Sequence, residues 1–95
     1  MSAVNIVIAS AIKSHHQLEF IYRRESQTVE PYCCGIGKDN RGLLSAWQVY
    51  GESPGWRQFH VDDMVGLRDN NKVFQPGRVG YPPNDSAMQS VHAHI

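Results

Sequence analysis

The chain has 95 residues, of which 41% are hydrophobic and 19% charged, so it can build one small core. Nine Lys and Arg residues balance nine Asp and Glu residues, and this neutrality argues against a protein that binds duplex DNA mainly by neutralising phosphates. No apolar run approaches the roughly 18 residues needed to cross a bilayer. Residues 1–14 lack the basic and cleavage regions of a signal peptide. We therefore expect a single domain without a membrane partner.

The two cysteines, Cys33 and Cys34, are adjacent. Bridged cysteines prefer Cα atoms that lie further apart, so a disulfide between neighbouring residues is strained. The sequence contains no CxxC spacing that would suggest a metal or redox site. We expect two reduced thiols within a strand, and hence a cytoplasmic protein.

The first segment has the apolar spacing of an amphipathic helix. Val4, Ile8, Ala11 and Ile12 recur at intervals that place them on one face of about three turns. The spacing predicts a helix over residues 3–15. A helix of this length is not stable alone in water, so its apolar face must pack on the residues that follow.

Residues 17–76 have the pattern of short strands joined by tight polar turns. Leu18, Phe20 and Tyr22 alternate with their neighbours, which is the period of a strand. Pro31 lies inside the second predicted strand and, because it cannot donate to a ladder, indicates an edge or a bend rather than a central position. The predicted strands cover residues 17–23, 27–35, 43–50, 56–61 and 65–68, with a helical turn at 62–64, a polar turn at 69–72 and a brief pairing at 73–74.

The end of the chain is poor in apolar residues. Residues 82–95 include Pro82-Pro83 and Asn84-Asp85, so we expect a surface or disordered tail behind one domain at residues 1–81. One helix followed by about five short strands indicates a mainly β fold, with a small bent sheet or a partly open barrel.

Five motifs follow one another along the chain: AIKSHHQLEFIYR (11–23), TVEPY (28–32), RGLLSAWQVYGE (41–52), GWRQFHVDDMVGLR (55–68) and VFQP (73–76). In order and spacing they resemble the WYL domain family, and the resemblance covers residues 3–81. It implies a helix attached to an Sm-like or SH3-like β-barrel, as found behind the DNA-binding helix-turn-helix of bacterial transcription regulators. The first helix here belongs to the domain itself, so the chain looks like a stand-alone copy. Its DNA-binding regulator would then be a separate chain.

The resemblance also implies ligand-binding residues, because members of the family are thought to bind single-stranded nucleic acid through basic and polar residues near these motifs. Arg57, Phe59 and Asp62 match the family pattern Arg-x-Phe-Arg-Leu-Asp-Arg-Ile. His60 and Asp63 replace two arginines of that pattern. His60 at a basic family position is a candidate for a hydrogen bond to the ligand.

Arg57 is the first candidate for the ligand site. It lies beside Trp56, and an arginine fork next to an aromatic ring suits phosphate contact together with base stacking. Its alternative role is a surface residue or a salt bridge to Asp62 or Asp63.

Three further arginines are candidates. Arg23 and Arg24 end the first strand beside Tyr22, where they either form the other side of a basic groove or solvate a turn. Arg41 lies in the polar turn before the third strand, and its alternative role is that of a solvated loop residue.

The aromatic residues differ in their expected burial. Trp47 occupies an apolar strand, in the place of the family's Trp-Tyr-Leu signature, and we expect it in the core. We expect Tyr22 and Tyr50 in the core as well. Trp56 begins its strand after a glycine, so we expect it half exposed, where it could stack on a base.

The sequence predicts neither an enzyme nor a cofactor. It contains no carboxylate pair, nucleophile elbow or phosphate-binding loop. His92 and His94 form a His-x-His pair that lacks further ligands, so we expect no metal.

Two functions of different class remain open. The first is a ligand-sensing module that binds single-stranded nucleic acid or a nucleotide-like anion in a regulatory or defence context. Its site would be a groove lined by Arg23, Arg57 and His60. The second is a protein–protein adaptor or self-assembling subunit, a homo-oligomer built through exposed sheet edges, with no nucleic-acid ligand.

Overall fold

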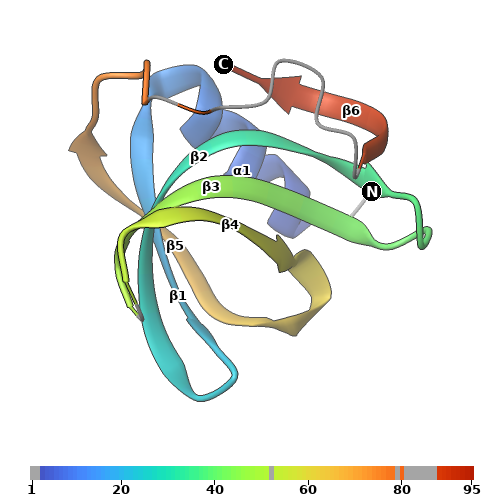
Figure 1. Cartoon of the computed structure of the whole chain (residues 1–95), viewed down its shortest axis with the longest axis horizontal. Coiled ribbons are helices and arrows are strands. Elements are labelled where there is room, and N and C mark those ends of the chain that lie inside the picture. The colour runs from blue at the N-terminus through green and yellow to red at the C-terminus, as the bar shows by residue number, and fades with distance from the viewer. Residues whose placement is uncertain (1–2, 52, 79, 81–87) are drawn as a thin grey trace.

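One N-terminal helix and a strongly bent antiparallel sheet of six strands make up the fold (Figure 1). The computed structural model describes residues 3–51, 53–78, 80 and 88–95, with side chains from residue 6 onward. The mainly β prediction with one helix is confirmed. In chain order the elements are α1 (Ala3–Ser14), β1 (His16–Tyr22), β2 (Glu25–Gly37), β3 (Gly42–Tyr50), β4 (Gly55–His60), the 3-10 turn η1 (Val61–Asp63), β5 (Met64–Val73) and β6 (Met88–His94).

Strand β2 organises the sheet. The strand order is β4-β3-β2-β1-β5, and β6 joins this path on β2. Along one edge, β2 pairs with β1 as far as Val29 and with β6 from Cys33 onward. Pro31 lies in the interval between these partners, next to an irregularity in the ladder to β3. The predicted bend at Pro31 is therefore correct, but the predicted edge is wrong. A residue without an N–H is tolerated in this central strand because the strand changes neighbour there.

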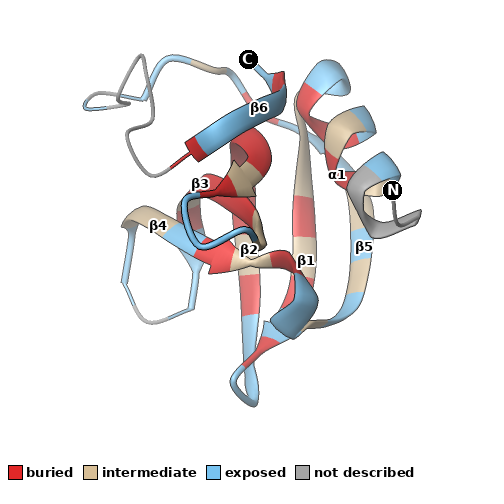
Figure 2. Cartoon of the chain, turned by 90° about the vertical axis from the view of Figure 1, so that its right-hand side faces the viewer, coloured by how far each residue is buried: buried red, intermediate tan, exposed pale blue. Residues whose placement is uncertain are grey.

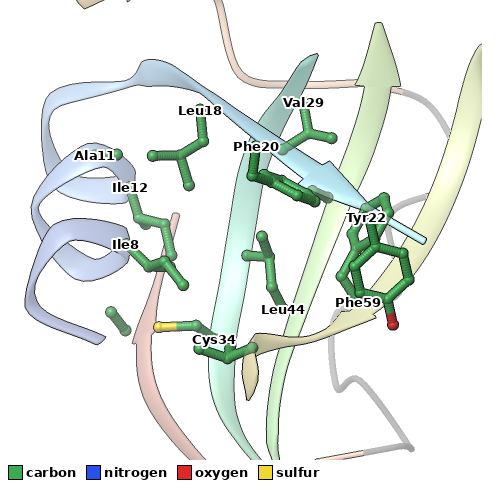
Figure 3. Close-up of a cluster of buried hydrophobic side chains, with 13 residues drawn as sticks. Ile8, Ala11, Ile12, Leu18, Phe20, Tyr22, Val29, Cys34, Leu44 and Phe59 are labelled. Carbon is green, nitrogen blue, oxygen red and sulfur yellow. The ribbon is translucent and has the colours of Figure 1, made fainter. Parts of the chain in front are cut away.

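The core lies between α1 and the concave face of the sheet. Ile8 and Ile12 are fully buried and point from α1 toward Leu18 of β1 (Figure 3). Further along, the rings of Phe20 and Phe59 meet edge to face, with centroids 5.1 Å apart. Figure 2 shows that the buried positions of α1 face the strands and that the opposite side of the helix is exposed. The helix is thus held by tertiary packing, as its length requires.

The polar turn predicted at residues 69–72 is wrong, because these residues lie inside β5. The turn signal nevertheless has a structural counterpart. In the ladder between β1 and β5, His16 pairs with Val73 and Leu18 pairs with Asp69. Between these two pairs β1 advances by two residues and β5 by four, so the extra residues of β5 form a bulge. Asp69 accepts from the backbone N–H of Asn71, which has a positive φ of 62°. In this chain, short polar side chains that usually favour turns stabilise a bulge within a strand.

The predicted tail at residues 82–95 needs a correction. Residues 88–94 form strand β6, antiparallel to β2, whereas residues 82–87 lie outside the described part of the chain. Met88 is buried with Cys33 and Leu43 in a small second cluster. Two buried side chains, Met88 and Ala93, fix a strand whose other residues are exposed, which is too weak a pattern to identify from sequence.

Cys33 and Cys34 are buried thiols in β2, without a disulfide, as predicted. Burial raises the pKa of the Cys34 thiol to about 11, and the neighbouring Cys33 adds to the rise. Since the thiolate is the reactive form, Cys34 should be a poor nucleophile.

We expect iodoacetamide at pH 8 to alkylate Cys34 at least about 100-fold more slowly in the folded protein than in urea, because thiolate is scarce at that pH. The measurement uses Cys33→Ala, which leaves Cys34 as the sole thiol, and follows alkylation by mass spectrometry. Equal rates in the folded and unfolded chain would show that Cys34 is accessible and ionised.

Within the described part of the chain, no helix is long and apolar enough to cross a membrane.

Candidate ligand-binding site

The tight turn between β1 and β2 presents two arginines in an unusual conformation. Tyr22 and Glu25 pair across the strands, so Arg23 and Arg24 alone form the loop. Their φ angles are 51° and 70°, the left-handed region that such two-residue hairpins require. Asn-Gly is the favoured sequence there, and a side chain with a full Cβ costs about 1 kcal/mol per residue. Strain of this kind is often retained where a side chain has a function.

Arg23 joins two other potentially cationic side chains in one open groove of about 360 Å³. Lys38 comes from the turn after β2, and His60 comes from the end of β4. The guanidinium of Arg23 also lies 5.4 Å from the centre of the Tyr22 ring. We call this hollow the basic groove. Its lining is completed by Tyr22, Gly37, Asp39, Leu43 and Gln58.

Hydrogen bonds hold the wall of the basic groove. The Asp39 carboxylate accepts from the backbone N–H of Arg41 at 3.1 Å and lies 2.9 Å from His60 Nε2. These contacts, the Arg41 amide first and His60 second, lower the pKa of Asp39 from its ordinary value. The backbone N–H of His60 donates to the hydroxyl of Tyr22 at 3.1 Å. Asp39 therefore remains ionised at neutral pH and orients the His60 ring toward the groove wall.

Arg57 is not part of the basic groove. Neighbouring residues of a strand point to opposite faces, and the two neighbours of Arg57 lie on the other face of β4. Its guanidinium turns back on the loop before β4 and donates to the carbonyls of Trp56 and Ser53 and to the hydroxyl of Ser53, at 2.9, 3.3 and 2.8 Å. Arg57 therefore braces a hairpin loop.

The other candidates lie apart from the basic groove or at its margin. Arg41 pairs with Asp63 at 3.2 Å, and Arg24 is exposed beyond Arg23 in the turn. Trp56 is half-buried, as predicted, but it lies in a separate aromatic cluster. Of the six predicted ligand residues, the structure brings together Arg23 and His60.

Three aromatic residues were predicted to lie in the core, and two of these predictions are wrong. Tyr22 is buried, as predicted. Tyr50 is 65% exposed at the end of β3. Trp47 is only half-buried, because its position on β3 points away from the main core, and its ring meets Trp56 edge to face at 5.5 Å.

An ion pair between the buried Glu30 and the partly exposed Arg78 lies beside these tryptophans, and it was not predicted from the sequence. The guanidinium of Arg78 makes two parallel hydrogen bonds to the Glu30 carboxylate, each 3.0 Å long. It also lies over the Trp47 ring, 4.8 Å from its centre. Tyr32 completes the enclosure by packing edge to face on Trp56 at 4.8 Å. We call Glu30, Tyr32, Trp47 and Trp56 the arginine clamp.

Comparison of the chain with models of known protein families, with curated proteins and with solved structures finds no match.

A metal centre has no support in the described ranges. Those residues contain no group of three or more His, Cys, Asp or Glu side chains placed to hold an ion. His92 and His94 are exposed on β6.

One sequence signal could have pointed to the clamp. Glu30 is a charged residue within the otherwise apolar run 29–34, and a carboxylate in such a strand needs a cationic partner. Its partner lies 48 residues further on, in a stretch without periodicity, so its identity could not be predicted.

Proposed function

We propose that the chain is a non-catalytic binding module whose basic groove takes a phosphate-bearing ligand, a nucleotide or a short segment of single-stranded nucleic acid. One observation carries the proposal. Arg23, Lys38 and His60 come from three separate segments and line the same open groove.

The chemistry of the groove supports this ligand class. An arginine fork and a lysine offer several charged donors to phosphate oxygens. The ring of Tyr22 gives Arg23 an aromatic support, and the groove is open enough for an extended ligand. Asp39 removes part of the positive charge, and the whole chain is neutral. Binding should therefore be weak, local and sensitive to salt.

A role in gene regulation or in defence against foreign nucleic acid belongs to the same proposal. The order of motifs that resembles WYL domains supports that role. In this view a separate DNA-binding chain would provide the regulatory output.

The two turn arginines make a matched test. Arg23→Asn and Arg24→Gly should each stabilise the protein by about 1 kcal/mol, because both replacements suit a positive φ. Only Arg23 lines the groove, so Arg23→Asn should weaken binding of a labelled 12-nucleotide single strand at least tenfold. Arg24→Gly should change the affinity by less than about threefold, the difference that one peripheral charge makes. Fluorescence anisotropy measures the affinities, and urea unfolding measures the stabilities.

Salt dependence tests the same groove. If Arg23 and Lys38 each neutralise one phosphate, the Kd for the strand should rise about sevenfold between 50 and 200 mM salt. Arg57→Ala is the control outside the groove and should leave this slope unchanged. Absence of binding at 50 mM salt, or equal binding by Arg23→Asn and wild type, would rule out the proposed site.

A second candidate function, self-assembly, is favoured by one observation on another face. Ile21, Tyr50 and Val65 are 44%, 65% and 62% exposed, and they border a hollow of about 470 Å³ lined by β1, β2, β5 and the end of β3. Beside it, Arg68 donates to Glu19 at 3.1 Å. Exposed apolar residues around a hollow are typical of a protein contact. A second copy of the chain would cover them by extending the sheet at β5, one end of the strand order.

Light scattering tests self-assembly. The wild type should be dimeric or larger at millimolar concentration, and Val65→Lys should be monomeric, because the lysine would place a charge in the contact. A monomeric wild type would exclude a contact of this kind.

A further inference from the structure

The carboxylate of Glu30 sets the chemistry of the arginine clamp. The Glu30 side chain is only 6% exposed, while that of its partner Arg78 is 42% exposed. A carboxylate removed from water needs a cation and donors within contact distance, because burial of an unpaired charge is costly. The clamp therefore presents a buried anion to a ligand that approaches from the surface.

The walls of the clamp select a flat cation. Trp47 lies against the guanidinium of Arg78, and Trp56 stands at 88° to Trp47. The two carboxylate oxygens of Glu30 each receive one N–H of the guanidinium. Only a guanidinium can stack on an aromatic face and donate two parallel hydrogen bonds at once; a lysine ammonium is a point charge without this geometry.

The clamp also contacts the backbone of its occupant. The Tyr32 hydroxyl accepts hydrogen bonds from the successive N–H groups of Gly77 and Arg78, both at 3.1 Å. Gly77 has a φ of 120°, which a residue with a side chain rarely adopts. The clamp thus holds a glycine–arginine unit of a polypeptide.

The occupant is a segment without regular secondary structure. Residues 74–78 follow the end of β5 and belong to no helix or strand. Its first residue, Phe74, is buried and donates its backbone N–H to the carbonyl of His15, and the clamp holds the segment at Gly77 and Arg78. The outward face of Arg78 remains accessible to solvent. The segment is thus held by Phe74 at one end and by the clamp at the other, and no sheet ladder is lost when Gly77 and Arg78 leave the clamp.

We propose that the arginine clamp is a binding site for a glycine–arginine segment of another polypeptide, and that the chain's own Gly77-Arg78 occupies it until such a ligand displaces it. The site is separate from the basic groove, because the two share no lining residue. It takes a cation where the groove takes an anion. The proposal therefore does not depend on the nucleic-acid function.

Peptide titration of Arg78→Ala tests the site. The probes are acetyl-Pro-Gly-Arg-amide, which copies residues 76–78, and the same peptide with lysine in place of arginine. Trp47 and Trp56 are the only tryptophans, so their two indole N–H signals in nuclear magnetic resonance report on the clamp directly. We expect Arg78→Ala to bind the arginine peptide at least tenfold more tightly than wild type does, because wild type competes with its own segment. The lysine peptide should bind at least tenfold more weakly.

Two controls separate recognition from a general charge effect. Arg68→Ala removes an exposed arginine elsewhere and should respond to the peptide as wild type does. Glu30→Gln combined with Arg78→Ala should abolish binding of the arginine peptide while both tryptophans remain. If Arg78→Ala does not fold alone, recovery of its folded spectrum by the arginine peptide, and not by the lysine peptide, supports the site.

Three results would overturn the proposal. They are unchanged indole signals of Arg78→Ala at millimolar arginine peptide, equal affinity for the two peptides, and failure of the arginine peptide to recover an unfolded variant. None of them bears on the oligonucleotide titration.

Discussion

Replacement of Gly35 by alanine is expected to detach β6 from β2 and to lower the free energy of unfolding by about 3 kcal/mol. A Cβ at this position would lie 2.0 Å from the carbonyl oxygen of Ser90 and 2.9 Å from the Cα of Val91, both backbone atoms of β6. Backbone atoms of a paired strand cannot move aside without breaking the ladder. The loss combines the exposure of buried Met88 with the lost ladder hydrogen bonds.

Gly37→Ala is the matched control, because Gly37 lies on the same strand and also pairs with β6. Its nearest obstacle is a side-chain oxygen of Asp39 at 3.0 Å, and a shift of a few tenths of an ångström in this exposed side chain relieves the contact. Hydrogen exchange of the amides in residues 88–94 should accelerate in Gly35→Ala and stay near the wild-type rate in Gly37→Ala. Equal protection of β6 in both variants would contradict the close approach of the two strands.

Removal of one partner of the Glu30–Arg78 pair is expected to have unequal effects. Arg78→Ala leaves a buried carboxylate without a cation and should cost about 2 kcal/mol, less than a fully buried pair because Arg78 is 42% exposed. Glu30→Gln leaves an arginine that water can hydrate, so it should cost about 1 kcal/mol. Urea unfolding of the two single variants measures this difference.

The double variant tests the cause of that difference. Glu30→Met combined with Arg78→Ala removes both charges and should recover most of the loss, to within about 1 kcal/mol of wild type. Salt at 1 M should leave the wild-type stability nearly unchanged, because the carboxylate is shielded from solvent. A double variant that is less stable than Arg78→Ala would show that packing of the two side chains, rather than charge burial, dominates.

The apolar pattern was sufficient to predict α1 and the first four strands. In these elements the hydrophobic residues repeat with the period of a helix or of a strand, and most of these residues face the core in the folded chain. The end of β5 and all of β6 were missed because contacts with residues distant in sequence, rather than a local apolar pattern, stabilise them. Polar residues in β5 are held by contacts with β1, such as that between Asp69 and His16 at 3.0 Å. Strand β6 depends on Met88 and Ala93 meeting β2, far away in sequence.

The candidate site was predicted only in part, because side-chain direction decides which residues converge. Arg57 and Trp56 are adjacent in sequence, so a shared site was expected, but strand geometry sends them to opposite faces. Arg23 and His60 are far apart in sequence, and the bent sheet places them on one groove. Lys38 lies in the turn after β2 and also lines that groove. No local sequence pattern indicates that this turn lies close to Arg23 and His60.

Length, charge and apolar spacing by themselves determined that this neutral chain has a mainly β fold with a helix packed on its core. They also determined that any charged site would be local, since neither sign of charge is in excess. The tertiary structure decided where such sites lie. It assembled a basic groove from three segments and paired Glu30 with an arginine 48 residues further along the chain. Burial creates the arginine clamp, because a carboxylate becomes selective for one kind of cation only when the fold has removed it from water.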